Sequence, residues 1–165
     1  NNDLANNYGN LCQRVFSFVE KNCSNKVPKP NKFLKEDLDL TDNLKNSVEE
    51  LKQLMEKQDL NIYIKKVVEF SFNANKYFND SEPWTVKKTN LDRMNTIVYT
   101  VLEQIKNISI LLCPIIPIAS KKALNIINID EINITLDNIN KKNVFDYDKE
   151  LKKKEILFKK IENDN

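Results

Sequence analysis

An amide and a guanidinium stand one helical turn apart near the beginning of the chain. Asn10 and Arg14 are separated by four positions, so on a helix their side chains share one face. That face lies about 100° from the centre of the apolar stripe of the same segment, away from the expected core. Both groups present donors in fixed planes, and the amide adds an acceptor. Such a pair can read the edge of an unpaired base, although spacing alone is more typical of an ordinary surface pair.

Trp84 follows Pro83 in a segment that we expect to be a loop between two helices. A tryptophan at that place can close the end of a helical bundle. It can equally serve as a platform on which an unstacked base lies. The residue alone leaves both interpretations open.

The composition excludes several classes of protein. The 165 residues include one glycine and no histidine. A single glycine argues against hairpin-rich sandwiches and barrels and against a glycine-rich phosphate loop. Without histidine the chain lacks the commonest general base and metal ligand. Its three widely spaced cysteines, Cys12, Cys23 and Cys113, indicate free thiols in a reducing compartment. We therefore predict no catalytic residue and no metal site.

Charge is distributed unevenly along the chain. The formal net charge of +2 is too small to indicate nucleic-acid binding. Residues 35–59 carry four lysines and eight acidic residues, whereas residues 141–160 carry eight lysines and four acidic residues. The acidic segment should face away from a polyanion, and the basic one is most simply a solvated helix. With no signal-peptide pattern and no long apolar run, we expect a cytoplasmic protein without membrane contact.

Apolar periodicity predicts an all-α protein, an antiparallel bundle of about five helices. The helices are expected over residues 3–23, 41–55, 60–78 and 90–112, with a fifth ending near 127. A linker should run from Pro28 to about Thr41, and Thr41 or Asp42 can cap the second helix. We expect a surface segment with a short extended piece over 129–139 and a final helix over 149–162. The domains are then a bundle, 1–127, and a C-terminal extension, 128–165, that packs back on it and whose last residues can fray.

Four stretches of the chain, taken in order, carry a resemblance to a known family. They are Asn2 to Arg14, Asn73 to Phe78 with Glu82-Pro83-Trp84, Leu111 to Pro117, and Leu157 to Glu162. Together they resemble the anticodon-binding domain of methionyl-tRNA synthetase, a class I aminoacyl-tRNA synthetase, over most of residues 1–127 and a short tail. In the tail, Lys159 replaces a usual proline and Lys160 a usual arginine. The opening Asn-Asp-Leu-Ala also fits related synthetases, but Pro83-Trp84 combined with Asn10 and Arg14 favours the methionine enzyme.

The resemblance implies a function for these residues. Full-length members of the family are ATP-dependent ligases that attach methionine to its tRNA, and their helical bundle reads the CAU anticodon. Matched by position, Trp84 would stack on a splayed anticodon base while Asn10 and Arg14 hydrogen-bond its edge. The family's His-Ile-Gly-His and Lys-Met-Ser-Lys-Ser motifs are absent here. We therefore expect a non-catalytic fragment without a cofactor, since ATP and methionine would bind the missing catalytic domain.

The implied partners are the initiator and elongator methionine tRNAs, through the anticodon loop, and the catalytic domain of the same chain; we expect a monomer. Two alternatives remain open. A helical protein-interaction module without an RNA role predicts a buried Trp84 and freely replaceable Asn10 and Arg14. The anticodon-binding domain of another class I synthetase predicts no preference for CAU. Spacing does not single out a phosphate contact among Lys26, Lys87 and Lys88, and Arg93 is interpreted as a helix-surface residue.

Overall fold

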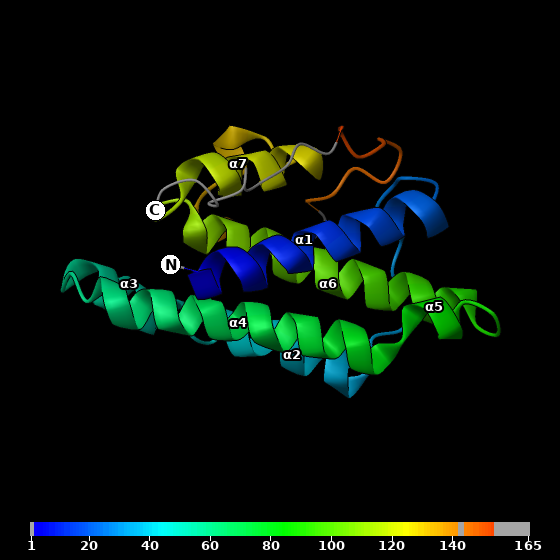
Figure 1. Ribbon diagram of the computed structural model, residues 1–165, viewed down its shortest axis with the longest axis horizontal. Coiled ribbons are helices and arrows are strands. Elements are labelled where there is room, and N and C mark those ends of the chain that lie inside the picture. Colours follow the sequence, from blue (N-terminus) through cyan, green and yellow to red (C-terminus); the bar gives the residue numbers. More distant parts are fainter. Residues whose placement is uncertain (1, 142–143, 154–165) are drawn as a thin grey trace.

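The computed structural model describes residues 2–141 and 144–153, and these form a helical bundle (Figure 1). The described residues contain seven α-helices, two 3₁₀ helices and no strand beyond one isolated bridge. The prediction of an all-α bundle is confirmed. The helices are α1 (Asn2–Asn22), α2 (Lys35–Lys45), α3 (Val48–Glu56), α4 (Leu60–Ser81), α5 (Pro83–Val86), α6 (Leu91–Leu112), α7 (Pro117–Ile126), η1 (Glu131–Asn133) and η2 (Leu136–Ile139).

Helix α6 is the centre of the bundle. It packs against α1, α2, α4, α5 and α7, and its side chains are buried around the whole circumference. It runs antiparallel to α1 and α4, which lie side by side and point in the same direction (Figure 1). The single apolar stripe expected from its sequence is therefore only part of its buried surface. A helix enclosed on all sides can bury short polar residues such as Thr100, whose hydroxyl donates to the backbone oxygen of Thr96 at 2.7 Å.

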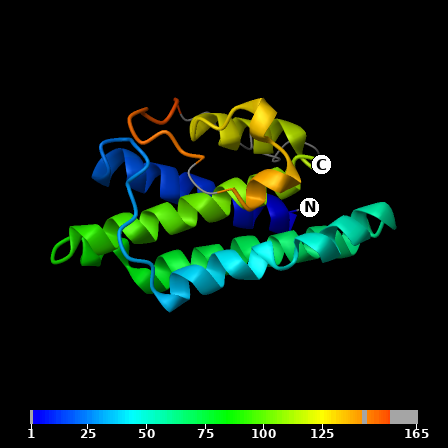
Figure 2. The same ribbon diagram turned by 180° about the vertical axis from the view of Figure 1, so that it is seen from behind.

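The linker predicted up to Thr41 is too long. Helix α2 begins at Lys35, and Thr41 is a buried residue inside it, not a cap. After α1 the chain crosses to another side of the bundle, where α2 and α3 follow one another along α4 (Figure 2). The start of α2 is fixed by Asp37, whose carboxylate accepts the backbone N–H of Leu34 at 2.8 Å. Because Leu34 is not a typical capping residue, the sequence carries no helix-start signal at the N-cap position of α2.

Arg93 is not the surface residue that the sequence suggested. Its two terminal nitrogens donate to the buried carboxylate of Asp37 at 2.6 and 2.9 Å, and the Tyr77 hydroxyl donates to the same group. Burial alone would raise the pKa of Asp37, but the hydrogen bonds from Arg93, Tyr77 and the Leu34 backbone outweigh it. They hold the pKa below its usual value. Through these bonds Asp37 connects α2 to Tyr77 on α4 and to Arg93 on α6.

Two expectations for the C-terminal part are wrong within the described residues. Between residues 129 and 139 the chain forms the short 3₁₀ helices η1 and η2, and only single residues such as Asp130 and Thr135 are extended. Residues 149–153 are not helical, because their backbone groups bond to other segments. The N–H of Leu151 donates to the Asn25 oxygen at 2.8 Å, and that of Lys152 donates to the Ile126 oxygen at 3.0 Å. The rest of the predicted final helix lies outside the described residues. No helix among those described is long and apolar enough to cross a membrane.

Candidate nucleic-acid interface

Arg14 is the centre of a polar cluster between α1 and α4. One terminal nitrogen donates to the Asn75 amide oxygen at 3.3 Å, and the other donates to the Asn79 amide oxygen. Asn75 and Asn79 are one turn apart on α4, so the guanidinium is held at two points. Asn75 is itself fixed, because its amide donates to the backbone oxygens of Asn7 at 3.0 Å and Ser71 at 3.3 Å. The cluster thus orients Arg14 without neutralising its charge.

The ring of Phe78 connects Arg14 to Trp84. The guanidinium carbon of Arg14 lies 5.4 Å from the centre of this ring, a cation–π distance. The Trp84 ring meets it nearly perpendicularly, with centroids 5.7 Å apart and planes at 77°. Phe18 makes a similar contact at 5.8 Å and 87°. Phe78 is buried, so it is a support that places two predicted residues, distant in sequence, against one ring.

Trp84 lies in a one-turn helix, α5, rather than in the expected loop. Glu82 has a left-handed backbone, φ 45° and ψ 57°, which ends α4 and turns the chain. Pro83 then occupies the first helical position, where its fixed φ suits a helix start and its missing N–H costs nothing. The Trp84 side chain remains 38% exposed. This partial exposure differs from the buried tryptophan that the interaction-module interpretation requires.

Asn10 lies on the same face of α1 as Arg14, one turn earlier, as the spacing predicted. Its side chain is exposed and makes no hydrogen bond within the part of the chain that the structure describes. Its amide is therefore free to donate and to accept. Arg14 has five N–H donors, of which the two bonds to Asn75 and Asn79 use two. Both side chains keep hydrogen-bonding capacity for a ligand at this surface.

Sequence reasoning missed Asn75, Asn79 and Phe78 as components of this cluster. The two asparagines repeat the four-residue spacing of Asn10 and Arg14, which is the signal that was available. In a chain with 25 asparagines, however, this spacing is common by chance. Phe78 reads only as one more residue of the apolar face of α4. Their roles become visible when α1 and α4 lie side by side.

One of the lysines left open by the sequence has a defined position. The ammonium of Lys87 donates to the Asn22 side chain at 2.6 Å, which joins the turn after α5 to the end of α1. Lys21 immediately precedes Asn22 on α1. Lys21 and Lys87 therefore both lie at the end of the bundle that carries Trp84. The acidic α2 and α3 lie along another side of α4 (Figure 2). The electrostatic conditions for a polyanion are therefore better at the α1–α5 end.

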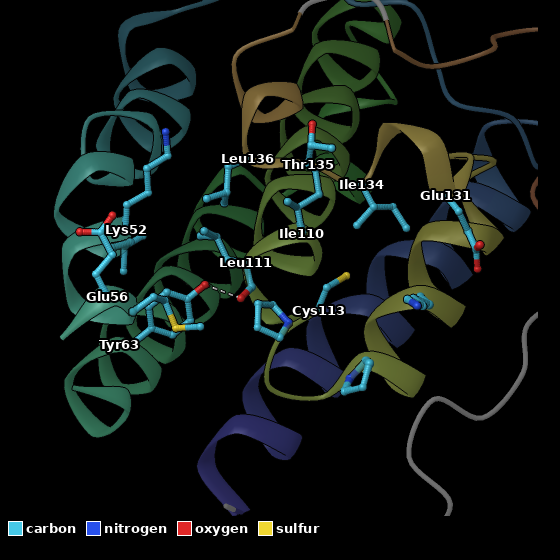
Figure 3. Close-up of a pocket in the computed structure, with 15 residues that line it drawn as sticks. Lys52, Glu56, Tyr63, Ile110, Leu111, Cys113, Glu131, Ile134, Thr135 and Leu136 are labelled. Atoms are coloured by element: carbon cyan, nitrogen blue, oxygen red, sulfur yellow. Dashed lines mark hydrogen bonds between the residues drawn. The ribbon is translucent and has the colours of Figure 1, made fainter. Parts of the chain in front are cut away.

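A separate cavity of about 660 Å³ lies near the start of α4 (Figure 3). Trp84 follows the opposite end of that helix. It opens between α3, the α6–α7 turn and the two 3₁₀ helices, and its lining is mostly apolar. The Tyr63 hydroxyl donates to the Leu111 oxygen there at 2.5 Å, and burial raises the pKa of Tyr63 to about 12. Burial likewise raises the pKa of the Cys113 thiol. These groups are shielded and protonated at neutral pH, so the cavity offers no activated nucleophile among the described residues.

Comparison with known proteins identifies the family of the chain. Residues 27–165 match the family model described as the anticodon binding domain of methionyl tRNA ligase. Trp84 lies inside this range, whereas Asn10 and Arg14 precede it. A methionine–tRNA ligase from Brucella suis is 36% identical over 127 residues, which are 77% of this chain and 25% of that protein. One from Thermotoga maritima is 30% identical over 132 residues, 79% of this chain and 21% of that protein.

A solved structure gives the same result at the level of the fold. Mycobacterium tuberculosis methionyl-tRNA synthetase in complex with methionyl-adenylate superposes with a TM-score of 0.87 and 25% identity. The match covers 94% of this chain and 31% of that one. The chain thus spans about a quarter of the length of the curated relatives that it matches. Because the family model covers most of the residues, the chain belongs to the family of anticodon-binding domains of methionyl-tRNA ligases.

Proposed function

We propose that this chain recognises the CAU anticodon of the initiator and elongator methionine tRNAs. The observation that carries the proposal is the convergence of Arg14 and the half-exposed Trp84 on Phe78, with Asn10 one turn away. Unpaired bases in RNA loops are recognised by stacking on aromatic side chains combined with hydrogen bonds to the base edge. Trp84 supplies the ring, and Arg14 and Asn10 supply the groups for the edge.

The three side chains have different tasks in this proposal. Trp84 stacks on a base that has left the loop stack, which adds affinity for any base. Arg14 only donates, whereas the Asn10 amide both donates and accepts. Together they suit a base edge that carries acceptors beside a donor. The bonds from Asn75 and Asn79 reduce the conformational entropy that Arg14 loses on binding, because its orientation is set beforehand.

We further propose that the chain acts as part of an ATP-dependent methionine–tRNA ligase. The match covers only about a quarter of a relative of that name, which supports a catalytic domain elsewhere in the same polypeptide. ATP and methionine would bind that domain, and no cofactor would bind the bundle. The chain would then contribute tRNA affinity and selectivity, not a reacting group. We propose that the enzyme is a cytoplasmic monomer.

The stacking role is tested by binding this chain to two anticodon stem-loops at several salt concentrations. One stem-loop carries CAU and the other a changed anticodon. Trp84→Ala should weaken binding of the CAU loop by about 1–3 kcal/mol, the contribution of one stacked base. Ile118→Ala is the matched control, because Ile118 is an exposed apolar residue on α7. Equal binding of both loops that weakens in parallel with salt would leave only nonspecific lysine electrostatics and reject the proposal.

A further inference from the structure

Phe72 is a second aromatic residue exposed near the Arg14 cluster. It lies on α4 with 57% of its surface exposed. It precedes Asn79 by seven residues, and a helix turns only about 20° away from the same direction over seven residues. Phe72 and Asn79 therefore lie on one strip of α4, two turns apart. Asn75, the other partner of Arg14, stands between them along the helix.

This strip borders α1. Asn75 reaches the backbone oxygen of Asn7, and Asn79 accepts from Arg14, so the flank of α4 that carries both faces the first helix. Phe72 continues that flank toward the start of α4, about 10 Å from Asn79 along the helix axis. Trp84 lies beyond the opposite end of the strip. The two exposed aromatic side chains thus bracket the Arg14 cluster.

The charge along this strip suits the uncharged ring of an RNA base better than a phosphate group. Lys76 and Asp80, which are adjacent in sequence to Asn75 and Asn79, form an exposed ion pair whose ammonium and carboxylate lie 2.6 Å apart. Each group therefore largely compensates the other. Arg14 is the charged group of the cluster that is held by amides alone. A bare aromatic face beside it offers stacking without base-edge readout, because phenylalanine has no donor or acceptor.

We infer that Phe72 stacks on a second unpaired base of the same RNA loop. The inference rests on the function proposed above. Proteins that hold single strands place successive bases on successive aromatic side chains, beside a positive charge. In this arrangement Trp84 and Arg14 hold the base that is read, and Phe72 holds a further base whatever its identity. The RNA segment bound by the chain would extend from α5 along the α1–α4 border.

The experiment combines side-chain replacement with removal of single bases from the RNA. Phe72→Leu keeps an apolar side chain but loses the aromatic face, and Phe72→Tyr retains that face. Ile62→Ala is the matched control, since Ile62 is 49% exposed on the same helix but ten positions earlier. Each variant, and Trp84→Ala, is titrated with the CAU stem-loop and with stem-loops in which one loop position at a time is abasic. Circular dichroism checks that every variant is folded.

We expect Phe72→Leu to weaken binding of the intact loop about fivefold or more, as loss of one stacked base does. Phe72→Tyr and Ile62→Ala should bind as the original chain does. The loss in Phe72→Leu should vanish for one abasic position, and that position should differ from the one coupled to Trp84. The inference fails if Phe72→Leu binds like the original chain, or if its loss couples to no loop position, while Trp84 still couples to one. If Trp84 couples to none either, the proposed function itself fails.

Discussion

The chain contains two arginines, and the structure uses them in opposite ways. Arg93 is paired with the buried carboxylate of Asp37, whose charge neutralises it inside the bundle. Arg14 is held at a similar number of points, but by the neutral amides of Asn75 and Asn79 and beside an exposed tryptophan. The first arrangement satisfies a charge internally. The second fixes the orientation of a charge and leaves that charge without a carboxylate partner, as the binding role proposed for Arg14 requires.

The largest expected effect comes from removing Arg93. Arg93→Ala leaves the Asp37 carboxylate buried without its charged partner, a change that typically costs about 3–5 kcal/mol of the free energy of unfolding. Urea denaturation followed by circular dichroism measures it. Lys35→Ala, which removes an exposed pair with Asp39, should leave the stability unchanged. If both variants unfold at the same urea concentration as the original chain, the Arg93 pair does not stabilise the fold.

Acid should weaken the Asp37–Arg93 ion pair. The effect on stability should be smaller than that of Arg93→Ala, because protonation removes the charge of Asp37 while both side chains stay in place. The pKa of Asp37 is lower in the folded state than in the unfolded state. The resulting stability is present above the unfolded pKa of about 3.9 and is lost as the pH falls through the folded value. Asp37→Asn should flatten this part of the stability–pH curve. An equally steep curve in that variant would assign the acid sensitivity to other carboxylates.

Replacing Arg14 should affect RNA binding rather than stability. Hydrogen bonds from a charged group contribute about 1.5–3 kcal/mol, so Arg14→Gln should weaken binding of the CAU stem-loop about tenfold or more. Arg14→Lys keeps the charge but loses the planar array of donors, so it should not restore preference for CAU. Fluorescence anisotropy with both stem-loops measures these effects. Full preference for CAU in Arg14→Lys would mean that only the charge matters.

The smallest effect should follow when the supports of Arg14 are removed. Asn75→Ala and Asn79→Ala each delete one bond to the guanidinium, while Arg14 itself remains. Binding should weaken by about 1 kcal/mol, because an unrestrained side chain loses more entropy on binding. The preference for CAU should decrease but persist. A complete loss of preference in either variant would show that the asparagine contacts the RNA directly.

The sequence was sufficient for features that depend on local periodicity. The apolar pattern located α1, α4 and α6, and prolines marked the ends of α4 and α6 and the start of α7. It failed for α2, because the helix start depends on Asp37 and on Arg93 from a distant helix, whereas Leu34 carries no capping signal. The residues of the candidate site were recognisable by their resemblance to a family. Their common contact with Phe78 was not, since it requires α1, α4 and α5 to meet in space.

The central claim is tested most directly by the ratio of the affinities for the CAU loop and for a loop with a changed anticodon. It is measured for the original chain, for Arg14→Gln and for Arg93→Ala, under conditions in which all three are folded. We predict a ratio above one at every salt concentration, lost in Arg14→Gln and kept in Arg93→Ala. A ratio of one in the original chain, or a ratio that survives in Arg14→Gln, would contradict it.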